Sequence, residues 1–112
     1  MFNFNGVSWR VVLVSPTHPI LLKPDGTRTI GACVKDNTTI YISENLSDEM
    51  LKRVLCHEFT HAAMFSYGVI LTIEQEELLA DLLTTYGEEI IHKTNRIFCR
   101  LKNRNRDLVY NY

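Results

Sequence analysis

Two histidines four positions apart, in the stretch LCHEFTHAAM (residues 55–64), impose the strongest constraint on this sequence. The surrounding pattern predicts a helix that begins after Ser47, a residue that caps helix N-termini, and stops at Gly68. On a helix, residues four apart lie about 40° from each other around the axis. His57 and His61 therefore share one face, and their imidazoles can converge on one Zn²⁺ ion.

Glu58 lies about 100° around the helix from His57, too far to be a comfortable ligand of the same ion. It can still reach a water on the open side of the metal. Zinc lowers the pKa of such a water toward about 7, and a neighbouring carboxylate can accept the proton. A metal ion, its bound water and a neighbouring carboxylate are the components of metal-assisted amide hydrolysis. The alternative is a pair of incidental surface histidines, but the small neighbours Ala62 and Ala63 favour close packing around a site.

A catalytic zinc site needs a third protein ligand and one position left for water. A second predicted helix, from Glu74 to Phe98, offers Glu77 and Asp81, which are four apart and share a face. We expect Glu77 to bind the metal and Asp81 to hydrogen-bond a ligating histidine. In the competing interpretation both acids belong to a solvated face. Glu76 and Glu74 are the weaker candidates for the third ligand.

Three segments rich in β-branched residues precede the first helix, and they predict strands at residues 8–15, 29–34 and 38–43. A turn at Asp36-Asn37 joins the last two as a hairpin. The expected fold class is α+β, a small three-stranded sheet packed on the histidine helix and a second long helix. Gly87 is expected to bend that second helix.

The 112 residues suffice for one domain with a real core, expected over 1–98, followed by a basic, tyrosine-rich tail over 99–112. The formal charge of −1 gives no strong attraction to nucleic acid or membranes. Three widely spaced cysteines do not form a disulfide framework. We see no signal peptide and no membrane-spanning stretch, so we expect a cytoplasmic protein. The sequence leaves the oligomeric state open.

The combination of His57-Glu58-x-x-His61 with Glu77-x-x-x-Asp81 resembles the gluzincin peptidases. Chain length and the short loop between the helices are most similar to the minigluzincins and to the ImmA/IrrE-type metallopeptidases of phages and mobile elements. In the latter the third ligand falls in a Glu-x-x-Ala pattern, here residues 77–80. The resemblance covers about 29–98. It implies a minimal zincin-like fold, a Zn²⁺ cofactor, a protein or peptide substrate, and regulatory proteolysis in a phage or mobile element.

The same resemblance implies an edge strand that binds an extended peptide, here Thr39, Ile40, Tyr41 and Ile42. Some minigluzincins are held latent by a C-terminal segment, and the last residues, LVYNY, suggest such a stretch. Two other functions stay open. One is a non-catalytic interaction module stabilised by zinc. The other is a nucleic-acid-binding accessory protein that uses the basic residues 93–106.

Overall fold

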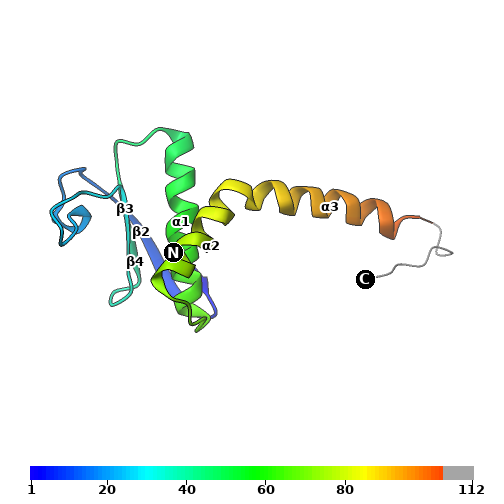
Figure 1. The fold of residues 1–112 in the computed structure, drawn as a ribbon, viewed down its shortest axis with the longest axis horizontal. Coiled ribbons are helices and arrows are strands. Elements are labelled where there is room, and N and C mark those ends of the chain that lie inside the picture. Colours follow the sequence, from blue (N-terminus) through cyan, green and yellow to red (C-terminus); the bar gives the residue numbers. More distant parts are fainter. Residues whose placement is uncertain (105–112) are drawn as a thin grey trace.

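A computed structural model describes residues 1–104, and it shows a small sheet packed against one helix, from which a long helical segment leads away (Figure 1). The elements follow in the order β1 (Phe2–Phe4), β2 (Val7–Val14), the 3-10 turn η1 (Pro19–Leu21), β3 (Gly31–Val34), β4 (Thr39–Ser43), α1 (Asp48–Ser66), α2 (Ile73–Leu82), the π-helical segment η2 (Leu83–Gly87) and α3 (Glu88–Lys102). This arrangement confirms the predicted α+β fold class. Within the described residues no helix combines the length and apolarity needed to span a membrane.

The sheet has four strands in the order β1-β2-β4-β3. The predicted hairpin of β3 and β4 is present, and β2 runs parallel to β4. Strand β1 is a fourth strand beyond the three predicted, and it pairs antiparallel with β2 through the two-residue turn Asn5-Gly6. Both turn residues have positive φ, 51° and 78°. An Asn-Gly pair is a strong signal for such a hairpin, so this strand could have been found.

The prediction that 38–43 forms the edge of the sheet is wrong. Strand β4 is paired on both sides, with β2 and with β3, and the side chains of Thr39, Ile40 and Ile42 are buried. Its backbone groups are therefore committed to the sheet and cannot add a peptide strand. The free edge that lies against α1 belongs to β3 instead.

The core lies between the sheet and α1. Trp9 is fully buried and packs with Ile40, Ile42 and residues of the helix. Its indole Nε1 donates a hydrogen bond of 2.8 Å to Ser66 Oγ, so the one polar atom of this large side chain is satisfied. Ser66 is the last residue of α1, and this bond therefore ties the C-terminal end of the histidine helix to β2.

Helix α1 matches its prediction closely, with Ser47 Oγ accepting from the Met50 amide at 3.2 Å. Strand β3 approaches this helix closely at Gly31. A methyl group at that position would lie 2.6 Å from Val54 Cγ1 and 3.2 Å from Glu58 Cγ. A side chain at position 31 would therefore clash with α1. Glycine lets the free edge of β3 lie against the turn of α1 that carries Glu58.

The second helical segment begins at Ile73 under a capping box made by Thr72 and Gln75. Its direction changes near η2, whose last residue is Gly87, where the sequence predicted a bend (Figure 1). A π-turn is a common cause of such a change in direction. Helix α3 continues to Lys102, past residue 99, where the sequence predicts that the tail begins. The proposed inhibitory stretch LVYNY lies outside the described residues.

We predict that Gly31→Ala destabilises the fold by about 1–3 kcal/mol, as overpacking of a filled interior does. Val54 is buried and β-branched, so it has little freedom to move away from the added methyl group. Urea unfolding checks this. Gly87→Ala is the matched control, since a Cβ there meets only Leu83 at 3.4 Å or more. Equal stabilities for Gly31→Ala and the parent would contradict the close approach.

Candidate metal centre

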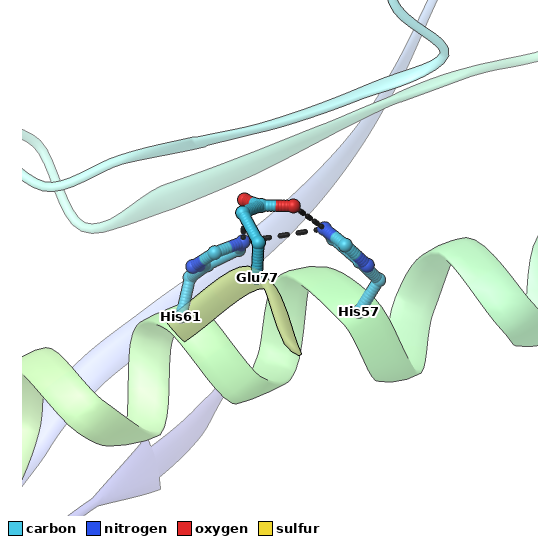
Figure 2. A group of neighbouring side chains, drawn as sticks. All are labelled: His57, His61 and Glu77. Carbon is cyan, nitrogen blue, oxygen red and sulfur yellow. Dashed lines mark hydrogen bonds and ion pairs between the residues drawn. The ribbon is translucent and has the colours of Figure 1, made fainter. Parts of the chain in front are cut away.

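Helix α2 crosses α1 so that Glu77 reaches between the two histidines (Figure 2). Glu77 Oε2 lies 3.1 Å from His57 Nε2, and Glu77 Oε1 lies 2.9 Å from His61 Nε2. The two Nε2 atoms are 3.3 Å apart. One donor atom from each of the three residues lies within 4.8 Å of the others, so the group could hold a metal ion.

The donor set fits zinc better than it fits calcium or magnesium. Two imidazole nitrogens and one carboxylate oxygen are a familiar ligand set for Zn²⁺, whereas the harder cations take oxygen. Ligand atoms at about 2.0–2.1 Å from a tetrahedral ion lie roughly 3.3–3.4 Å from one another. The separations of 2.9 to 3.3 Å between donors of the three residues are near that spacing. Three protein ligands also leave a fourth position for water.

Nδ1 of each histidine, the ring nitrogen that does not face Glu77, has a carboxylate beside it. Glu76 Oε1 lies 2.7 Å from His61 Nδ1, and its side chain is 14% exposed. Asp81 Oδ1 lies 3.5 Å from His57 Nδ1, with 70% of the side chain exposed. Such partners fix the tautomer and the orientation of a ligating imidazole.

Asp81 is therefore on the expected side of the site, at the limit of hydrogen-bonding distance. The sequence pattern offers Glu76 only as a weaker candidate for the third ligand, whereas the structure places its carboxylate on Nδ1 of His61. Helical projection alone does not give this contact, because it depends on how α2 crosses α1. Glu74 is exposed in the first turn of α2, away from this group.

Glu58 is buried, with 8% of its surface exposed, and it faces β3 from the same turn of α1 as His57. Burial is the largest effect on this carboxyl and raises its pKa. The positive charges of the two imidazoles lower the pKa, whereas the negative charge of Glu77 raises it further. Within residues 1–104 the hydrogen bonds include none to its carboxylate. The group is thus held beside the histidines with its oxygen atoms available.

An open cleft of about 350 Å³ runs between the edge of β3 and the two helices, and its lining includes Gly31, Cys33, His57, Glu58, His61 and Glu77. A second hollow of about 250 Å³ shares Glu58 and continues past Arg53 and Thr84. Burial, reinforced by the charge of Glu58, raises the pKa of the Cys33 thiol to about 12. Cys33 is therefore a neutral thiol near the site at neutral pH.

The four residues expected to bind substrate do not line this cleft. They belong to β4, which β3 separates from the free edge. Tyr41 instead stacks on His18, with ring centroids 6.3 Å apart. His18 accepts a hydrogen bond from the Ile20 amide at 3.0 Å and caps η1, as suits a loop histidine. His92 lies on α3, outside the group.

Comparison with family models matches residues 15–98 of the chain to the IrrE N-terminal-like domain, which is classed as a peptidase family. The match begins just after β2, runs from η1 to most of α3, and includes every residue of the group described above. Comparisons with curated proteins and with solved structures gave no significant match.

We predict that Glu58→Gln stabilises the metal-free protein at pH 7, raising its Tm by a few degrees. The folded chain raises the pKa of Glu58 above its ordinary 4.5, so the folded state binds this proton more tightly than the unfolded chain does. The stability that the acid contributes is present below about pH 4.5 and is lost as the pH rises through the folded pKa. The gain from the amide should therefore vanish toward pH 4.

Thermal melts in chelator across this pH range measure the effect. Glu44→Gln, in the exposed turn before α1, is the control and should leave Tm unchanged. If Glu58→Gln raises Tm as much at pH 4 as at pH 7, the gain does not come from removing a buried negative charge.

Proposed function

This chain belongs to the family of IrrE N-terminal-like domains, and on that basis we propose that it is a zinc metallopeptidase that cleaves extended protein or peptide segments. The observation that carries the proposal is the convergence of His57, His61 and Glu77 at the wall of a cleft that also holds Glu58. Three ligands with a position left open are the mark of a catalytic rather than a structural zinc site.

A bound zinc ion would supply the positive charge that acidifies a coordinated water and polarises the substrate carbonyl. Glu58 would accept the proton of that water and later deliver it to the leaving amine. Its position supports this role, because its carboxylate lies beside the histidines and is not tied up in a described ion pair. Its low exposure supports it too, since a raised pKa suits a group that both takes and returns a proton near neutral pH.

Glu76 and Asp81 would act by holding the ligands. Each accepts, or lies in range to accept, a hydrogen bond from Nδ1 of one histidine, which leaves Nε2 of that ring free to face the ion. The shorter contact and the lower exposure both belong to Glu76, so we assign it the larger part in fixing the site.

The edge of β3 is the proposed binding site for substrate backbone. The amide of Ser43 donates to Ile30 O at 3.0 Å, and in an antiparallel pair this bonding alternates from residue to residue. With the observed register, Gly31 and Cys33 direct their backbone groups away from β4 and toward the cleft. An extended peptide could pair there and pass over the histidines. A role in regulatory proteolysis of a phage or mobile element is the biological part of the proposal.

We predict one zinc ion per chain, with binding weakened more than about 100-fold in Glu77→Ala, because only two imidazoles then remain. Glu76→Ala should weaken binding by about 10–100-fold, as loss of a partner to a ligand histidine does. Asp81→Ala should have the smaller effect, given its longer contact and exposed side chain. Competition with a chromophoric chelator gives the affinities. Glu74→Ala is the control on the same helix and should match the parent.

We predict that Glu58→Gln keeps zinc but loses about 10²–10⁴-fold in the rate of peptide-bond hydrolysis, the usual worth of a general base. The assay uses an unfolded, fluorescently labelled protein and zinc-loaded chain, with release of labelled peptides as the readout. Glu44→Gln controls for a change of one carboxylate far from the cleft. Cleavage that persists in Glu58→Gln would refute the assigned base. A zinc-loaded parent that cleaves nothing would instead favour a zinc-stabilised interaction module.

A further inference from the structure

Helix α3 carries an apolar face that the rest of the described chain leaves uncovered. We define this α3 apolar face as Ile90, Ile91, Ile97, Phe98 and Leu101 of α3, together with Tyr86 of the preceding segment η2. All but Leu101 are between 42% and 60% exposed. The helix leads away from the sheet and α1, so within residues 1–104 no element packs over it (Figure 1).

The length and pattern of α3 indicate that it has a partner. An isolated helix of about 15 residues is marginal in water, and most helix stability comes from packing of an apolar face. A contiguous patch of exposed large apolar side chains marks an interaction site. Thr94 lies in the middle of the α3 apolar face, and its hydroxyl donates to Ile90 O at 2.7 Å. Its polar atom is thus satisfied, and its small size permits close approach at the centre.

The charges of α3 are divided between its ends. Glu88 and Glu89 occupy the first turn, whereas Arg96, Arg100 and Lys102 follow in the second half. Within residues 1–104 no acidic side chain pairs with these three cations. The helix is therefore acidic at one end and basic at the other.

The acidic end has only exposed ion pairs within the chain. Glu88 meets Lys52 at 2.9 Å, and Glu89 meets Lys93 at 2.8 Å, with all four side chains more than half exposed. Pairs of this kind contribute little and exchange partners readily.

We propose that α3 is a dimerisation helix that pairs in antiparallel orientation with α3 of a second copy of this chain. In that orientation the α3 apolar faces cover each other, and the acidic end of each helix lies opposite the basic end of the other. Around the helix axis, Glu89 and Arg100 lie within about 20° of each other, and Glu88 and Lys102 lie together on the other flank. Flanks of the same side meet in an antiparallel pair, so Glu89 comes opposite Arg100 and Glu88 opposite Lys102 of the second copy.

A parallel pair would place acid against acid at one end and base against base at the other, which is destabilising. The charge pattern thus selects both the partner, a second copy, and the direction of pairing. The cleft is formed by β3, α1 and α2, and pairing through α3 leaves it open.

Light scattering on the eluted chain of residues 1–112 tests the pairing. We expect a dimer at tens of micromolar, a monomer for Ile97→Glu, and a dimer for His92→Glu, which adds the same charge on the polar side of α3. Circular dichroism and zinc content, unchanged in both variants, show that the domain itself is intact. A monomeric parent, or equal loss of the dimer in both variants, would overturn the proposal.

Charge reversal tests the orientation. Glu88→Lys with Glu89→Lys should raise the dimer Kd by about tenfold or more, because both complementary flanks become repulsive. In a parallel pair like charges would already face each other, and the reversal would change little, which would refute the antiparallel arrangement. If the parent is monomeric and sediments with vesicles of phosphatidylglycerol and phosphatidylcholine, the α3 apolar face is a membrane contact and the dimer proposal fails.

Discussion

The crossing of α2 over α1 is the contact on which the site depends. It places Glu77 between Nε2 of the two histidines and Glu76 on Nδ1 of His61. Glu58 and Asp81 lie on the same cluster, so four carboxylates surround two imidazoles. Like charges gathered in this way disfavour one another unless a cation compensates them. A divalent ion at this point would offset that repulsion and join two helices of a small domain, so metal binding and folding would be coupled.

The sheet supplies the second constraint, because it sets what lies across the cleft from the helices. Gly31 lets β3 approach α1 to within van der Waals contact of Val54 and Glu58. The hydrogen bond from Trp9 to Ser66 anchors the other end of α1 to β2. These two contacts, one to β3 and one to β2, hold α1 in place against the sheet. The result is a cleft with a free strand edge on one wall and the histidines on the other.

The sequence predicted the parts of the site that follow from local periodicity. Spacing alone put His57 and His61 on one face, and a second four-residue spacing selected Glu77 and Asp81. It could not give the pairing order of the strands, because each strand pattern is compatible with several neighbours. Alternation predicts a strand at 38–43 and the family resemblance implies that it is an edge strand, yet β4 lies inside the sheet. Contacts between distant segments, such as Glu76 with His61 and Gly31 with Val54, likewise depend on a packing that periodicity does not encode.

The central claim is that His57, His61 and Glu77 together bind one zinc ion, and its most direct test is the zinc-edge X-ray absorption spectrum of the loaded protein. Cys33 lines the same cleft, so a sulfur ligand is the alternative that the structure itself offers. We predict nitrogen and oxygen scatterers alone at about 2.0–2.2 Å, with the multiple scattering of two imidazoles. A sulfur shell at about 2.3 Å, or the signal of a single imidazole, would contradict it.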